Sequence, residues 1–121
     1  MNINKFTQKS IQAVNDLEKI AYEYGNQEIE EEHLLYCLLN QEDSLILKLI
    51  EKMEINKDEF QRSLIDALNK RPKVSGGQVY IGKDLNRVLV SAEDEAKAMG
   101  DEYVSVEHLF LSLLRYPNAG I

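Results

Sequence analysis

Two histidines with acidic neighbours offer the most specific chemistry that this sequence could perform. Glu30 precedes His33 by three residues, a spacing that places both side chains on one helical face and supplies half of a carboxylate-bridged dimetal site. His108 repeats the arrangement, but Ser105 stands where a second glutamate would be needed. We therefore interpret both histidines as first-turn residues that hydrogen-bond to neighbouring backbone, and keep a helical dimetal enzyme as an alternative.

Other catalytic motifs are weaker. Cys37 lies between Tyr36 and Leu38 in an apolar helical stretch, where a thiol is usually buried and inert. Gly76-Gly77 lacks the G-x-x-x-x-G-K-[ST] order that binds phosphates, so this chain is not expected to bind or hydrolyse ATP. A single cysteine excludes an internal disulfide and suits a reducing cytoplasm. The sequence therefore predicts a chain that is not an enzyme and has no cofactor of its own.

Charge and hydropathy limit the partners. The formal net charge of −7 argues against DNA or RNA, because phosphate binding requires clustered Lys and Arg. The one short basic cluster, Lys70-Arg71-Pro72-Lys73, is typical of a helix C-terminus. No apolar run is long enough to span a membrane, and no signal peptide is present. We expect no nucleic-acid partner and no membrane.

An internal repeat indicates which elements position these residues. A shift of 75 positions aligns Glu32-His33-Leu34 with Glu107-His108-Leu109, and Leu38-Leu39 with Leu113-Leu114. The same shift aligns Gly25 with Gly100. A match at one fixed period indicates that one supersecondary unit was used twice.

Apolar spacings of three and four residues predict helices throughout. The expected helices run from near Thr7 to before Gly25, through Leu34 and Leu38 to about Asn40, from Asp43 or Ser44, from Asn56, from about Leu85 to Gly100, and from Ser105. We predict one all-α domain over residues 1–121, a tandem of a four-helix unit. Repeat one spans 1–70, a linker spans 71–80, and repeat two spans 81–121 and stops after two helices. Part of the face formed by Leu109, Phe110, Leu113 and Leu114 should then be exposed, or covered by a second molecule.

Several short motifs carry a family resemblance: Phe6-Thr7, Gly25-Asn26-Gln27, Glu32-His33-Leu34-Leu35 and Gly76-Gly77-Gln78-Val79. Together with the linker that begins Arg71-Pro72-Lys73, they resemble the amino-terminal (Clp repeat) domain of the ClpB-type AAA+ disaggregase family.

The resemblance implies a binding module that engages exposed segments of misfolded or aggregated polypeptide and passes them to a hexameric AAA+ ring of the same parent chain. The parent would be a cytoplasmic ATPase that uses ATP and magnesium and cooperates with an Hsp70-type chaperone system. The alternative is an adaptor-docking domain, as in the ClpA and ClpC branches.

The same resemblance implies a substrate site. Thr7, Asp101 and Glu107 match positions associated with substrate handling, and Leu89, Ala13 and Leu109 match apolar neighbours that line the associated groove. Each polar residue also has a plain structural interpretation: Thr7 as an N-cap, Asp101 as a turn residue, and Glu107 as a first-turn acid facing the helix dipole.

Overall fold

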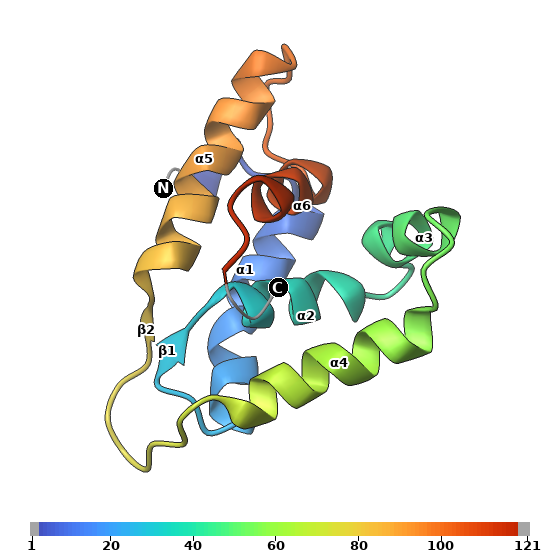
Figure 1. Cartoon of the computed structure of the whole chain (residues 1–121). Helices are drawn as coiled ribbons and strands as arrows, with labels where there is room; N and C mark the ends of the chain where they lie inside the picture. Colours follow the sequence, from blue (N-terminus) through green and yellow to red (C-terminus); the bar gives the residue numbers. More distant parts are fainter. Residues whose placement is uncertain (1–2, 119–121) are drawn as a thin grey trace.

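The computed structural model describes residues 3–118, and within them the fold is all-α, as predicted (Figure 1). The elements are a 3-10 turn (Ile3–Lys5), α1 (Gln8–Glu23), β1 (Glu28–Ile29), α2 (Glu31–Leu39), α3 (Leu45–Lys52), α4 (Lys57–Lys70), β2 (Tyr80–Ile81), α5 (Lys83–Ala98) and α6 (Val106–Arg115). Across this part of the chain, no helix has both the length and the apolar character to cross a lipid bilayer.

Local sequence signals set the helix ends. Asn56 caps α4, where its Oδ1 accepts two first-turn N–H groups at 3.0 and 3.1 Å. Ser44 rather than Asp43 caps α3, because its hydroxyl accepts the N–H of Leu47 at 3.1 Å. Gly25 and Gly100 follow α1 and α5 with φ of +70° and +74°, a left-handed conformation that favours glycine after a helix.

Two short parallel backbone pairings join the halves of the chain, and each half supplies the equivalent segment to one of them. The first half's Ile29 pairs with Ile81, and the second half's Val104 pairs with Phe6. The 75-residue shift converts one pairing into the other, since it takes position 6 to 81 and position 29 to 104. The flanking hydrogen bonds obey the same shift: Thr7 N–H donates to the Val104 carbonyl at 2.9 Å, and Gly82 N–H to that of Ile29 at 2.8 Å. Two equivalent units related by a pseudo-twofold axis would form this pattern.

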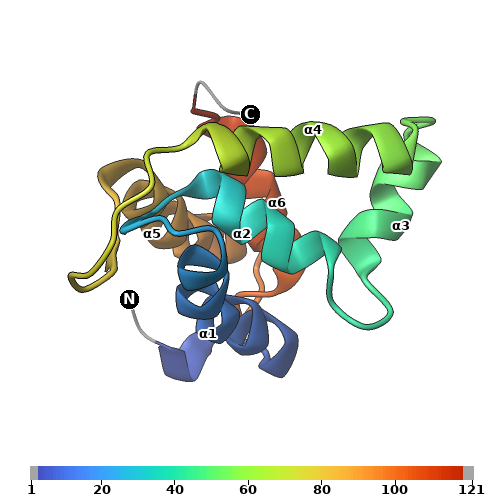
Figure 2. The same cartoon turned by 90° about the horizontal axis from the view of Figure 1, so that it is seen from below.

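The core lies around α2 and α6. Helix α6 contacts α1, α2, α3 and α5, while α2 lies between α1 and α4 (Figure 2). Only part of the α6 face formed by Leu109, Phe110, Leu113 and Leu114 is exposed, because the first three are buried against the rest of the chain. Leu114 is exposed, as predicted, with 51% of its surface accessible.

Candidate functional site

Thr7 lies where the two halves meet. It caps α1, because its Oγ1 accepts the N–H of Ser10 at 3.3 Å and lies 3.0 Å from the Ser10 hydroxyl. That hydroxyl also donates to the carbonyl of Val104 at 2.8 Å, in the opposite half of the chain. The N-cap interpretation of Thr7 is therefore confirmed, and the residue is held beside the start of α6.

Glu107 lies across a shared hollow from Thr7. It is an exposed acid in the first turn of α6, whose N-cap is Ser105. A hollow of about 370 Å³, which we call the Thr7–Glu107 hollow, separates the starts of α1 and α6. The hollow is lined by Thr7, Gln8, Lys9, Gln41, Asp43, Leu45, Ser105, Val106 and Glu107.

The wall opposite α6 is fixed by hydrogen bonds. Lys9 Nζ donates to the carbonyl of Glu42 at 2.8 Å, and Gln41 Nε2 donates to the carbonyl of Lys9 at 2.8 Å. These two bonds join the loop before α3 to the first turn of α1. The hollow therefore has a pre-formed shape, which lowers the ordering cost of binding.

Asp101 lies in a different place. It lines a separate hollow of about 320 Å³ together with Lys5, Glu93 and Val104. Its Oδ2 accepts a hydrogen bond from His108 Nε2 at 2.8 Å. Since the N–H of Ser105 donates to His108 Nδ1 at 2.9 Å, the ring proton is assigned to Nε2. Asp101 thus orients the histidine in the first turn of α6 and does not line the Thr7–Glu107 hollow.

The first half offers a matched control for this contact. Asn26, 75 positions before Asp101, binds His33 Nε2 through Oδ1 at 3.0 Å. Asp101→Asn should therefore keep the contact and change the free energy of unfolding by less than about 0.5 kcal/mol. Asp101→Ala leaves a buried N–H unpaired and should cost about 1 kcal/mol. Urea denaturation measures both values, and equal losses for the two variants would contradict the positioning role.

The three apolar residues predicted to line the groove are buried. Ala13, Leu89 and Leu109 have 0%, 1% and 0% of their surface accessible. In this structure they are core residues that support α1, α5 and α6, and they do not line an accessible groove. The apolar lining of the Thr7–Glu107 hollow comes instead from Leu45 and Val106.

Comparison with known proteins decides the family. A family model described as the Clp repeat (R) N-terminal domain matches residues 5–121, which is nearly the whole chain. The chain belongs to the Clp repeat N-terminal domain family.

Two relatives that match this chain are named as chaperone proteins. The chain is 44% identical over 126 residues to the chaperone protein ClpB of Nitratidesulfovibrio vulgaris, covering 100% of this chain and 15% of that protein. The chaperone protein ClpB of Porphyromonas gingivalis is 40% identical over 114 residues, covering 94% of this chain and 13% of that protein. The chain therefore spans only about a seventh of these relatives. The Hsp104 N-terminal domain from Candida albicans has the same fold, with a TM-score of 0.85 at 21% identity over 93% of this chain and 75% of that chain.

His33 has a structural role in this Clp repeat domain. The N–H of Glu30 donates to its Nδ1 at 2.9 Å, which confirms the backbone-bonded interpretation, and its Nε2 binds Asn26. Asn26 Nδ2 in turn donates to the carbonyl of Pro72 at 3.2 Å and so holds the start of the linker. Burial, and next the charge of Arg71, lower the His33 pKa to about 4. The ring is therefore neutral at physiological pH.

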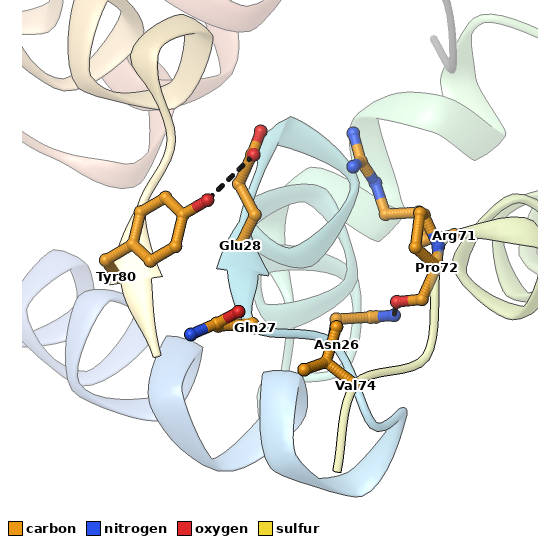
Figure 3. Close-up of a pocket in the computed structure, with 7 residues that line it drawn as sticks. All are labelled: Asn26, Gln27, Glu28, Arg71, Pro72, Val74 and Tyr80. Carbon is orange, nitrogen blue, oxygen red and sulfur yellow. Dashed lines mark hydrogen bonds between the residues drawn. The ribbon is translucent and has the colours of Figure 1, made fainter. Parts of the chain in front are cut away.

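A third hollow of the Clp repeat domain lies beside this linker (Figure 3). It measures about 180 Å³ and is lined by Asn26, Gln27, Glu28, Arg71, Pro72, Val74 and Tyr80. The Tyr80 hydroxyl donates to Glu28 Oε2 at 3.3 Å, and Arg71 Nε donates to Glu32 on α2. Burial acts to raise the Glu32 pKa, but the hydrogen bonds from Arg71 and Asn118 lower it overall. The polar groups that line this hollow therefore mostly hydrogen-bond to one another or to neighbouring residues.

Glu31 is the buried acid that sequence reasoning missed. It has no accessible surface, and neither carboxylate oxygen makes a hydrogen bond of normal geometry within residues 3–118. Burial, followed by repulsion from Asp84, Glu30 and Glu32, raises its pKa to about 7. The backbone of Asn118 offsets only part of this shift. The signal in the sequence was the repeat itself, because position 106, the equivalent of Glu31, is valine.

Cys37 is not placed for nucleophilic chemistry. The thiol is buried in α2, and burial, followed by the charges of Asp16 and Glu23, raises its pKa to about 12. A thiol with this pKa is protonated at neutral pH and is a poor nucleophile. Its structural interpretation is confirmed.

Proposed function

We propose that this chain is the substrate-engaging amino-terminal domain of an ATP-dependent chaperone of the ClpB type. It binds exposed segments of misfolded or aggregated protein and delivers them to the AAA+ ring of the parent protein. ATP and magnesium would be bound by that ring. The family membership and the names of the ClpB relatives support this assignment.

The observation that carries the proposal is the Thr7–Glu107 hollow. Thr7 and Glu107, which the family resemblance implies for substrate handling, lie on the same hollow although 100 positions separate them in the chain. Apolar walls supply affinity that tolerates different sequences, at roughly 25 cal/mol per Å² buried before ordering costs. The carboxylate of Glu107 at the rim favours basic or amide-bearing segments. Asp101 contributes indirectly, by holding His108 and thereby the first turn of α6.

A titration with labelled, permanently unfolded polypeptide tests this function. We expect saturable binding that Glu107→Gln weakens at least fivefold, because the variant loses the rim charge. Its stability should change by less than about 1 kcal/mol, the value of a first-turn acid near the helix dipole. Glu18→Gln, which removes the same charge from an exposed position of α1, is the control and should bind normally.

A lack of binding to unfolded polypeptide would favour the alternative function. A chain that ignores unfolded polypeptide but binds one folded partner tightly would be an adaptor-docking domain of the ClpA or ClpC type.

A further inference from the structure

Most polar side chains that line the Thr7–Glu107 hollow already have a partner inside the protein. Those with a hydrogen bond to another group of the chain are Thr7, Lys9, Gln41, Asp43 and Ser105. The carboxylate of Asp43, for example, lies 2.6 Å from Lys48 Nζ. A client that used these groups would first have to replace the bonds they make, which lowers the net gain. Apolar contact is therefore the main means by which the hollow can distinguish clients.

Leu45 supplies most of the apolar surface that a client can reach. Of the two apolar residues in the lining, Leu45 has 41% of its surface accessible and Val106 only 6%. Leu45 is the first residue of α3, whereas Val106 is the first residue of α6. The accessible apolar side chain thus belongs to the wall that faces α6.

Hydrogen bonds on both sides of the turn before α3 hold Leu45 in this wall. The hydroxyl of Ser44 donates to the carbonyl of Leu38 on α2 at 2.6 Å. Four residues before Leu45, Gln41 Nε2 donates to the carbonyl of Lys9 on α1 at 2.8 Å. The wall is therefore ordered before a client arrives, and less conformational entropy is lost on binding.

We propose that Leu45 is the specificity-determining contact of the hollow and that Gln41 is a positioning residue that acts through Leu45. The substrate class is an extended client segment that places one aliphatic or aromatic side chain against Leu45. This inference rests on the proposed function and specifies its substrate. It assigns the apolar part of recognition to the turn before α3, in the first half of the chain.

The selectivity is tested with two labelled, unstructured peptides of glycine, serine and lysine that differ only at one central position, leucine or serine. The parent chain should bind the leucine peptide at least about fivefold more tightly, as expected for burying part of a leucine side chain. Leu45→Ser should remove this preference. Met53→Ser is the control, because it removes a 55% accessible apolar side chain just past the other end of α3, and it should keep the preference.

The positioning role is tested by a double-mutant cycle with labelled unfolded polypeptide. Gln41→Met keeps the side-chain length but cannot donate a hydrogen bond, and it should weaken binding about threefold in the parent chain. It should have no further effect in Leu45→Ser, because residues that act through one another are not additive. Gln12→Met, at an exposed position of α1, should bind as the parent chain does. Urea denaturation confirms that each variant is folded under the binding conditions.

Two results would overturn the inference while leaving the proposed function in place. One is unfolded polypeptide that binds with dependence on Glu107 but not on Leu45, with no preference between the two peptides. The other is an equal loss of binding from Gln41→Met in both backgrounds, which would give Gln41 a role separate from Leu45. If the parent chain binds neither the unfolded polypeptide nor the peptides, the proposed function fails together with the inference.

Discussion

Replacing Glu31 with valine is expected to raise the free energy of unfolding at pH 8 by about 2–3 kcal/mol. Glu31 is fully buried, and its carboxylate oxygens lack well-formed hydrogen bonds within the part of the chain that the structure describes. An ionised carboxylate in such a place is costly. The equivalent position in the second half is Val106, which is buried at the same turn of α6, so the protein already contains the replacement in an equivalent helix.

The stability gained by Glu31→Val should increase as pH rises. The Glu31 pKa is about 7 when folded and 4.5 for an ordinary glutamate, so the native state binds more protons between these values. The free energy of unfolding of the parent chain therefore falls as pH rises through this window. The total loss is up to about 3 kcal/mol, since each pKa unit corresponds to 1.36 kcal/mol.

Urea denaturation of both chains at pH 5 and pH 8 measures the effect. The advantage of Glu31→Val should be small at pH 5 and large at pH 8. Glu18→Val, at an exposed position of α1, controls for the general effect of adding valine to a helix. An identical pH dependence in the parent chain and in Glu31→Val would show that Glu31 does not titrate in this window.

Leu109→Ala should destabilise the chain by about 3 kcal/mol. The side chain has no accessible surface and lies in α6, which contacts four other helices. Truncating a buried leucine loses transfer free energy and leaves a cavity, which together cost about 2–5 kcal/mol. Leu114→Ala, on the exposed side of the same helix, should cost less than about 1 kcal/mol.

This comparison separates stability from binding. Below the unfolding transition, Leu109→Ala should bind unfolded polypeptide as the parent chain does, because the side chain does not reach the Thr7–Glu107 hollow. A variant that keeps its stability and loses binding would instead restore the groove-lining interpretation of Leu109.

The helices could be predicted from sequence because their signals are local. Apolar spacing and caps such as Asn56 and Ser105 depend on residues three or four positions apart, and the structure places helix starts directly after both. Burial depends on the whole fold. Leu89 and Leu109 satisfy the helical pattern equally well as core or as groove lining, so periodicity alone could not distinguish the two.

Strands of two residues could not be predicted either, because the alternation of apolar and polar residues that indicates a strand needs a longer run. The pairing of Phe6 with Val104 involves residues 98 positions apart, and nothing near either residue specifies the partner. Thr7 and Glu107 reach the same hollow through this pairing, so their spacing in the sequence could not predict that they lie together.

The reciprocal strand pairing also orders events during synthesis. Phe6, in the segment before α1, can pair with Val104 only after residue 104 has left the ribosome. The segment is therefore synthesised long before its pairing partner. Until then Phe6 and the backbone beside it are open to other chains. The first helix is therefore made long before the segment that pairs with the residues preceding it.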